Sequence, residues 1–418
     1  MGAPEEDTHL HMSTVNENEW PVSLESIQRA QQELATIARV TPLESSHVLE
    51  KYTGVPTYFK CENLQRSGSF KVRGAYVRMA RLSEQDRARG VVAASAGNHA
   101  QGVALGAAAL GIKAVVYMPV GAALPKVEAT RSYGAEVRLV GETVEEALAA
   151  ARTEAERTGA VFIHPFDHAD VIAGQGTLAL EILAQVPDVK TVLAPVGGGG
   201  LVAGLVAAFA QVAPEVTVVG VQASRASAYT ESLAAGHPVT HAVQSTMADG
   251  IAVATPGELP FEIIARGNTR MVNVSEEDIS RALLYVAERA KLVVEPAGVT
   301  GVAALMAHPG EFDGPVVALL SGGNVDPNVL LRVIRHGLVS AGRFMVIKVR
   351  LVDRPGALAQ MLFDVAAQNA NIMHVDHVRT GVDLEIDEVE VTMQVETKGP
   401  EHCAQVLEYM RSKGYHLS

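Results

Sequence analysis

The chain has 418 residues, 48% of them apolar, which is too long for one typical hydrophobic core and predicts two or three domains. Its net charge of −13 argues against nucleic acid or an anionic membrane as a partner, and no apolar run reaches the length of a membrane span. The two cysteines, Cys61 and Cys403, are too few for a disulfide framework or a zinc site, so we expect a reducing, cytoplasmic location.

The amino-terminal residues 1–20 are polar, and we expect them to form a loosely attached tail. Ser23 can cap a helix over residues 23–39, where apolar side chains recur at helical spacing. Short strands and helices then alternate. The expected strands are 91–94, 114–118, 136–140, 191–196 and 315–320, and the expected helices are 101–110, 125–134, 144–157 and 201–210. This alternation predicts an α/β fold of two parallel-sheet units, with ligands near the carboxyl ends of the strands.

Lys71 lies among small and apolar residues in the segment Ser67-Gly68-Ser69-Phe70-Lys71-Val72-Arg73-Gly74-Ala75. An amine held in a tight pocket loses its charge by desolvation and can then attack an aldehyde. A surface lysine on a loop is the alternative, and these nine residues alone leave it open.

Four consecutive glycines follow the predicted strand 191–196 and precede an apolar helix that Leu201 opens. They are Gly197, Gly198, Gly199 and Gly200. A glycine run at the start of a helix can aim several backbone N–H groups at one anion. No Gly-Lys-Ser or Gly-Lys-Thr sequence follows, so a nucleoside-triphosphate loop is not expected. A phosphate monoester is a better candidate than a dinucleotide, because Lys71 could bind an aldehyde on the same ligand.

Ser321 follows the predicted strand 315–320, where its hydroxyl could face a ring nitrogen or simply form a turn. An amine, a phosphate-binding glycine run and a small hydroxyl, each in a loop or at the end of a strand, together predict a site for pyridoxal phosphate. That cofactor stabilises carbanions by withdrawing electrons.

Six ordered segments resemble motifs of the fold-type II pyridoxal-phosphate enzymes. They are residues 67–75, 94–102, 172–177, 197–200, 295–298 and 321–324. The chain is most similar to the threonine ammonia-lyases (threonine dehydratases), with the serine racemases as near relatives, over about residues 22–335. The resemblance implies a tryptophan-synthase-β-like fold for a catalytic region of residues 21–340, with a small subdomain of about residues 64–162 inserted in a larger one.

The resemblance also implies a role for each site residue. Lys71 would bind the cofactor covalently and, once the substrate displaces it, remove the α-proton. The other cofactor contacts would be Phe70 against the ring face or in the core, Asn98 at the ring hydroxyl, the glycine run with Leu201 at the phosphate, Gly250 nearby, and Ser321 at the ring nitrogen. The loop Ser95, Ala96, Gly97, Asn98 and His99 would take the substrate carboxylate, with a purely structural His99 as the alternative. Glu295 would either position a ligand or cap a helix that begins at Pro296.

Two departures separate the chain from the serine racemases. Ala96 stands where that family has a serine as a second base, so elimination, which needs a base on one face only, is favoured over racemisation. Gln222 and Ala228 stand where that family's divalent-metal site needs carboxylates, so no metal is expected there. The implied reaction is conversion of L-threonine to 2-oxobutanoate and ammonia, with L-serine as a slower substrate. A serine racemase, a β-replacement enzyme using a sulfur nucleophile and a non-catalytic regulatory protein remain open.

The predicted order of strands and helices changes near residue 344. Residues 343–418 read as strand, helix, two strands and helix, with Val389, Val391, Met393 and Val395 on one face of the last strand. This α+β (βαββα) unit resembles an ACT domain, a regulatory module that binds amino acids. The candidate effector contacts are Asp353, Pro355 and Gly356, and isoleucine or valine is the candidate effector. A unit that only joins subunits is the alternative, and a homodimer or homotetramer is expected.

Overall fold

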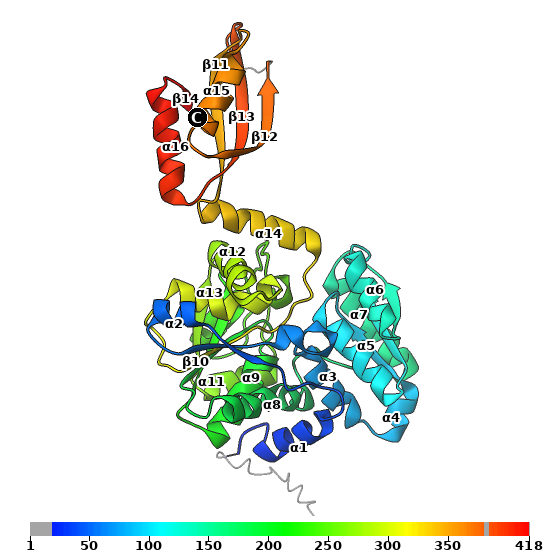
Figure 1. The fold of residues 1–418 in the computed structure, drawn as a ribbon. Helices are drawn as coiled ribbons and strands as arrows, with labels where there is room; N and C mark the ends of the chain where they lie inside the picture. Colours follow the sequence, from blue (N-terminus) through cyan, green and yellow to red (C-terminus); the bar gives the residue numbers. More distant parts are fainter. Residues whose placement is uncertain (1–18, 380–383, 418) are drawn as a thin grey trace, which may run out of the picture.

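The computed structural model describes residues 19–379 and 384–417. Two α/β units lie side by side, and a third, smaller unit lies beyond helix α14 (Pro327–Ser340) (Figure 1). Most of the expected tail lies outside the described residues. Trp20, however, is packed against the core, and the Arg266 guanidinium lies 4.7 Å from the centre of its ring, so the tail does not extend that far. Within the described ranges, no helix is both long and apolar enough to cross a membrane.

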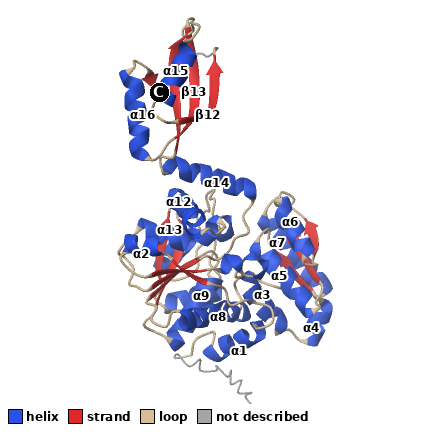
Figure 2. Cartoon of the chain, in the orientation of Figure 1, coloured by secondary structure: helices blue, strands red, loops and turns tan. Residues whose placement is uncertain are grey.

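The larger unit contains a six-stranded sheet in the order β1-β2-β10-β7-β8-β9, in which only β1 runs antiparallel to its neighbour. The strands are β1 (Leu43–Ser45), β2 (Thr57–Lys60), β7 (Thr191–Pro195), β8 (Thr217–Ala223), β9 (Arg270–Val274) and β10 (Val316–Leu319). Alternate side chains of one strand enter two different cores, as Val192 and Leu193 do. Both faces of this sheet are therefore covered (Figure 2).

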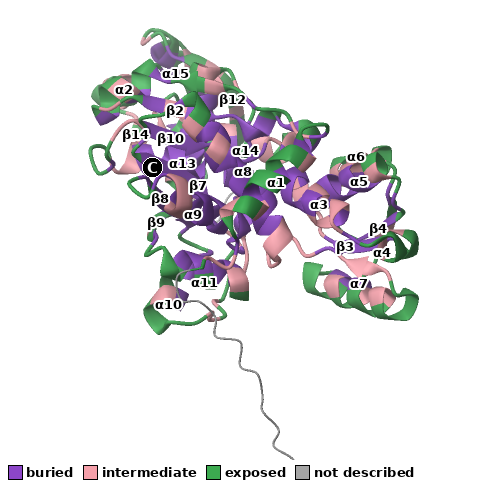
Figure 3. Cartoon of the chain, turned by 90° about the horizontal axis from the view of Figure 1, so that it is seen from below, coloured by how far each residue is buried: buried purple, intermediate pink, exposed green. Residues whose placement is uncertain are grey.

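Helices cover the two faces of the larger sheet. One face packs against α1 (Leu24–Leu34), α8 (Ala169–Gln185), α9 (Gly200–Val212), α10 (Ala228–Ala235) and α11 (Glu258–Arg266), and the other against α2 (His47–Thr53), α12 (Glu276–Tyr285) and α13 (Thr300–Ala307). Figure 3 shows the buried residues concentrated along β7 and α9, whereas α10 also has an exposed side. The apolar strands and helices of the sequence thus become a sheet with a core on each side.

The smaller α/β unit contains four parallel strands in the order β5-β4-β3-β6. The strands are β3 (Val91–Ala94), β4 (Ala114–Met118), β5 (Glu136–Leu139) and β6 (Val161–Phe162), and the helices are α3 (Lys71–Ala80), α4 (Glu84–Arg89), α5 (Asn98–Leu110), α6 (Leu124–Ser132) and α7 (Val144–Thr158). Helices α3, α5 and α6 pack against one face of the sheet, and α7 packs against the other.

The third unit is an antiparallel sheet in the order β12-β13-β11-β14. Its elements are β11 (Phe344–Val352), α15 (Ala357–Ala366), β12 (Asn371–Val378), β13 (Glu388–Glu396), α16 (Pro400–Ser412) and β14 (His416–Leu417). The four apolar residues predicted to share a face of β13 are all buried. The predicted order βαββα is wrong by one element, because β14 has only two residues and no period that a sequence pattern could reveal.

Two predicted helix boundaries differ from the structure by more than two residues. Helix α1, which Ser23 does cap, ends at Leu34 instead of residue 39. The carbonyl of Arg39 accepts hydrogen bonds from Gln65 and Arg73, and these long-range contacts hold the chain outside the helix. Helix α5 begins at Asn98 rather than residue 101, with Gly97 at its N-cap.

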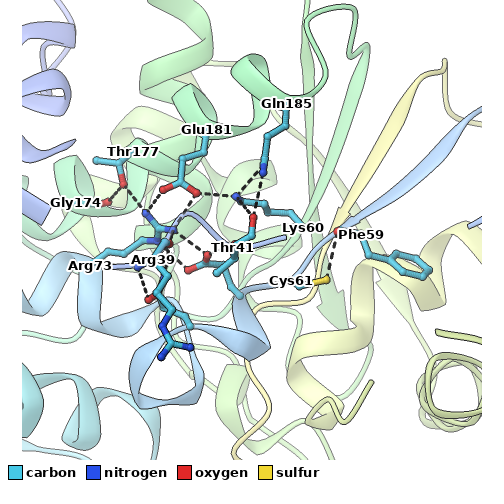
Figure 4. A network of polar contacts seen from close by, with 12 residues as sticks. Arg39, Thr41, Phe59, Lys60, Cys61, Arg73, Gly174, Thr177, Glu181 and Gln185 are labelled. Carbon is cyan, nitrogen blue, oxygen red and sulfur yellow. Dashed lines mark hydrogen bonds and ion pairs between the residues drawn. The ribbon is translucent and has the colours of Figure 1, made fainter. Parts of the chain in front are cut away.

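A buried network of charged side chains joins the larger unit to α3 (Figure 4). The Arg73 Nε and Nη2 atoms donate to the two carboxylate oxygens of Glu62 at 2.8 and 2.9 Å. Arg73 Nη1 donates to Glu181 at 2.7 Å, and the Lys60 ammonium donates to the same carboxylate at 2.6 Å. Burial alone would raise the pKa of Glu62, but the Arg73 guanidinium holds that pKa below its usual range. Two cations and two carboxylates therefore balance inside the protein.

We expect Arg73→Met to lower the free energy of unfolding by about 3–5 kcal/mol, because two buried carboxylates then share one cation. Urea denaturation monitored by circular dichroism measures the change. Arg157→Met is the matched control, since Arg157 pairs with Glu154 at the surface and its removal should have no measurable effect. Equal stability of the two variants would contradict this role of the network.

Candidate active site

Lys71 is the first residue of α3, and the chain just before it is tied to the end of β10. Ser67 and Gly68 both adopt the left-handed backbone conformation, with φ of 63° and 72°. Ser69 then forms an isolated antiparallel bridge with Gly322, and the Phe70 N–H donates to the Ser321 carbonyl at 3.1 Å. Two segments about 250 residues apart in the sequence, the lysine motif and the Ser321 motif, are thus adjacent in the fold.

The Lys71 amine is half-buried, and it donates a hydrogen bond to the Pro165 carbonyl at 3.1 Å. Burial lowers the pKa of this amine to about 8, although the nearby Glu295 carboxylate opposes the shift. Phe70 belongs to the main core, with its ring centre 5.2 Å from the amine. The surface-lysine alternative is wrong, and the amine can lose its proton near neutral pH.

The glycine run lies at the start of α9, which begins at Gly200 with Gly199 as its N-cap. No side chain caps the helix, and its first backbone hydrogen bond runs from Ala203 N–H to the Gly199 carbonyl. The N–H groups before Ala203, including that of Leu201, have no partner within the helix and can bind an anion.

Two aromatic side chains pack against the glycine run. A β-carbon at Gly198 would lie 2.3 Å from the Phe166 ring, and one at Gly199 would lie 1.9 Å from the Tyr229 hydroxyl. Gly199 also has a φ of 96°, which favours glycine. Glycine is thus required by close packing as well as by the backbone conformation.

The segment His164–Asp167 connects the lysine to the glycine run, because Pro165 accepts from Lys71 and Phe166 packs on Gly198. His164 Nδ1 accepts the Asp167 N–H at 2.8 Å, and burial lowers the pKa of His164 to about 4. Sequence analysis did not assign a role to Phe166 or to Tyr229. Strand β6, which precedes Phe166, has only two residues and was not among the expected strands, so no local signal in the sequence marked this segment.

Asn98 is held between two other polar side chains. Its Nδ2 donates to Glu295 Oε1 at 2.6 Å, and its Oδ1 accepts from Asn324 Nδ2 at 2.9 Å. Burial and the nearby Asp249 carboxylate raise the pKa of Glu295 to about 7. Glu295 stands at the N-cap of the 3₁₀ turn Pro296–Val299, but its side chain makes no cap hydrogen bond, so the capping alternative is wrong.

Gly250 lies close to Glu295, because a β-carbon there would be 3.8 Å from Glu295 Oε1. In the loop after β3, Ser95 Oγ accepts the Gly97 N–H at 3.1 Å, and residues 95–98 are half-buried. His99 is buried, with Nε2 at 2.8 Å from the Ile163 carbonyl. Burial and the charge of Lys71 lower its pKa to about 3, so His99 stays neutral, which fits the structural alternative.

The expected effector residues Asp353, Pro355 and Gly356 are far from this cluster, in the exposed turn between β11 and α15 (Figure 1). Asp353 pairs with Arg379 at 3.2 Å. An open groove of about 670 Å³ in the same unit is lined by the ends of α15 and α16, and none of the three residues lines it. The structure does not join the effector candidates to the groove.

Gln222 stands where the serine racemases have a metal-binding carboxylate. It is buried, and its side-chain amide donates to the Ala226 carbonyl at 3.3 Å. Ala228 begins α10. Residues 19–379 and 384–417 contain no group of three or more His, Cys, Asp or Glu side chains placed to hold a metal ion.

The donor set fits pyridoxal phosphate. The first turn of α9 offers N–H groups to a phosphate, Lys71 offers an amine of lowered pKa to an aldehyde, and Asn98 offers an oriented amide. Ser321 is buried at the end of β10, beside the backbone that carries Lys71. The phosphate, the aldehyde, the ring hydroxyl and the ring nitrogen of the cofactor therefore each have a candidate partner among these residues.

We expect Gly199→Ala to weaken pyridoxal-phosphate binding at least about tenfold, because the new methyl group meets Tyr229 in a strained backbone conformation. Titration of the apoprotein, followed by cofactor absorbance, measures the affinity. Gly111→Ala is the control, since Gly111 also has a positive φ, 66°, but open space around it. An unchanged affinity for Gly199→Ala would show that the run does not hold the phosphate.

The comparisons with known proteins agree with pyridoxal phosphate as the cofactor. A family described as pyridoxal-phosphate dependent enzyme matches residues 34–322. An L-threonine ammonia-lyase of Thermotoga maritima is 45% identical over 396 residues, which are 95% of this chain and 99% of that protein. The processed form of threonine deaminase isoform 2 from Solanum lycopersicum superposes with a TM-score of 0.71 at 37% identity, covering 75% of this chain and 93% of that one. Maize serine racemase superposes with a TM-score of 0.72 at 32% identity, covering 77% and 99%. The chain belongs to the family of pyridoxal-phosphate dependent enzymes, and the predicted fold-type II fold is confirmed.

Proposed function

We propose that this enzyme is a threonine ammonia-lyase, which converts L-threonine to 2-oxobutanoate and ammonia. The observation that carries the proposal is the Lys71 amine, whose pKa is about 8 and whose backbone is tied to the Ser321 segment. The relative from Thermotoga maritima, which carries that name, supports the choice of substrate. The alignment covers nearly all of both chains, which supports the same activity for both proteins.

Pyridoxal phosphate, when bound, would stabilise negative charge at the substrate α-carbon. The N–H groups at the start of α9 would hold its phosphate, Asn98 its ring hydroxyl and Ser321 its ring nitrogen. A neutral serine hydroxyl does not keep that nitrogen protonated, which favours loss of a β-substituent over transamination. Lys71, once free, would take the α-proton, since its amine is neutral in a large fraction of molecules near pH 8.

The loop of residues 95–99 would bind the substrate carboxylate through backbone N–H groups. By the resemblance to the serine racemases, Ala96 would lie on the face opposite Lys71, and its methyl group is neither a proton donor nor a base. Racemisation needs an acid and a base on opposite faces, so this methyl group favours elimination in spite of the similarity to maize serine racemase. L-Serine would be a slower substrate, giving pyruvate.

Replacing Lys71 with Ala should abolish the visible absorbance of the bound cofactor and lower 2-oxobutanoate production by at least about a thousandfold, because the covalent attachment and the base are both lost. Lys51→Ala, on the exposed face of α2, is the matched control and should leave both unchanged. A keto-acid assay with L-threonine, a D-serine assay with L-serine and a trial with sulfide separate the three enzyme classes. D-serine formation, sulfide incorporation or keto acid from Lys71→Ala would each contradict the proposal.

The proposal extends to the organisation of the chain. Residues 21–340 would be the catalytic region, with a small subdomain of about residues 64–162, and residues 343–418 an ACT-like regulatory domain in a cytoplasmic homodimer or homotetramer. The family match ends at residue 322, before α14, and the third unit has its own core. Isoleucine or valine would bind near Asp353 and Gly356 and regulate isoleucine biosynthesis.

We expect one of these amino acids to change the rate with L-threonine by about 5-fold or more, because an effector must bind two states unequally. Steady-state kinetics with added isoleucine or valine, together with sedimentation, tests both activity and assembly. Asp353→Ala should weaken the response, whereas Asp376→Ala on the exposed strand β12 should not. The absence of any response in the unaltered enzyme would remove the regulatory proposal.

A further inference from the structure

We infer that Glu295 is a positioning residue: together with Asn324 it holds the Asn98 amide in one orientation, with an N–H group available to the ring oxygen of the cofactor. The inference relies on the proposed function for the identity of the reaction. Its structural basis is a chain of three hydrogen-bonded side chains contributed by α5 and by the loops after Lys291 and β10.

A backbone carbonyl sets the direction of this chain. The Ser67 carbonyl can only accept, so the Asn324 atom 2.6 Å away from it is the nitrogen Nδ2. The same nitrogen lies 2.9 Å from Asn98, and it must donate its second hydrogen there, to Oδ1. The nitrogen of Asn98 therefore faces Glu295 Oε1, 2.6 Å away. If the Asn98 amide were flipped, its N–H group would face the N–H group of Asn324, and its oxygen would face the Glu295 oxygen. Both contacts would then be repulsive.

An amide nitrogen carries two hydrogens, and Glu295 takes only one of those on Asn98. The second is left for a ligand. Asn98 thus meets the cofactor as a donor, and a donor favours the ionised form of a ring hydroxyl over the neutral form. Glu295 and Asn324 would thereby select the charge state of the ring, although neither needs to touch it.

The surroundings of Glu295 are built to hold its carboxyl group in place. The side chain is buried, and its backbone N–H donates to the Gly322 carbonyl at 3.0 Å. A β-carbon at Gly322 would lie 2.3 Å from Glu295 Oε1, so the glycine after Ser321 provides the space that the carboxyl occupies. The motif 321–324 therefore serves Glu295 as well as the ring nitrogen.

The charged groups that face Glu295 come from three other elements. Asp249 raises its pKa, while Lys126 on α6 and Lys71 on α3 lower it, and with burial the result is about 7. Oε1 accepts from Asn98 whether or not the carboxyl carries a proton. The ionised carboxyl raises the pKa of Lys71, so ionisation of Glu295 above pH 7 keeps the amine protonated to a higher pH.

Three substitutions separate the hydrogen bonding of the Asn98 amide from the ionisation of Glu295. Glu295→Gln keeps the acceptor oxygen but has no ionisation, Glu295→Ala removes the acceptor, and Asn324→Asp keeps the shape but removes both donors. The measurements are the dissociation constant of pyridoxal phosphate and the cofactor absorbance from pH 5.5 to 9, with kcat and KM for L-threonine. Glu231→Gln, an exposed carboxylate paired with His241, is the matched control.

We expect Glu295→Gln to bind pyridoxal phosphate within about twofold of the unaltered protein while losing an ionisation near pH 7 from the absorbance and from kcat. Glu295→Ala and Asn324→Asp should bind it about tenfold more weakly and lower kcat more than they raise KM. Glu231→Gln should change nothing. If Glu295→Ala does not fold, Glu295→Gln and Asn324→Asp still carry the test.

Retention of the pH 7 ionisation in Glu295→Gln, or unchanged cofactor affinity in Asn324→Asp, would overturn the inference. The cofactor measurements need no turnover. If they follow the expected pattern while the unaltered protein leaves L-threonine intact, the positioning role stands and the proposed function fails. If turnover is normal and the cofactor measurements do not change, only the positioning role fails.

Discussion

The candidate site depends on the attachment of the first turn of α3 to the carboxyl end of β10. Three contacts make it: the Ser69–Gly322 bridge, the Phe70–Ser321 hydrogen bond and the Asn324–Ser67 hydrogen bond. They bring the start of the smaller α/β unit to the middle of the larger sheet. Lys71 follows these contacts directly, so its amine has a defined place relative to Ser321 before any ligand binds. A site with this degree of preorganisation loses little entropy when it binds its cofactor.

Close helix packing supports the same arrangement. A β-carbon at Gly102 of α5 would lie 3.0 Å from the Lys71 carbonyl carbon, and one at Gly174 of α8 would lie 2.7 Å from Gly74. The glycines let both helices approach α3 backbone to backbone, and Arg73 ties α3 to Glu62 and to Glu181 of α8. Lys71 is thereby held by neighbours on several sides, and the two roles proposed for it, covalent attachment and proton transfer, would need motion of its side chain only.

Much of the fold and of the candidate site could be predicted from the sequence, because these features depend on interactions between residues that are close in the chain. The alternation of apolar strands and helices indicated the α/β fold, and the glycine run indicated a helix start with free N–H groups, both of which the structure has. The proximity of Lys71 and Ser321 was predicted from the rule that ligands bind near the carboxyl ends of strands. These features depend on residues that are neighbours in the chain or on a general rule of sheet topology.

The features that sequence analysis missed depend on residues far apart in the chain. The carboxylate of Glu62 and the guanidinium of Arg73 are close in sequence, but Glu181 reaches them only through the packing of α8 on α3. Phe166 and Tyr229 pack against the glycine run from two separate segments of the chain. The periodicity of apolar residues does not predict contacts of this kind. The early end of α1 has the same origin, because the bonds that stop it come from Gln65 and Arg73.

The buried ionic network has a consequence for the behaviour of the protein in concentrated electrolyte. Dissolved ions weaken the attraction between exposed partners such as Arg157 and Glu154, which lie in water within a Debye length of many counterions. Lys60, Arg73 and Glu62 have almost no contact with water, so counterions do not reach them. The joint between the two α/β units should therefore keep its strength across a wide range of ionic strength, even where the surface ion pairs contribute nothing.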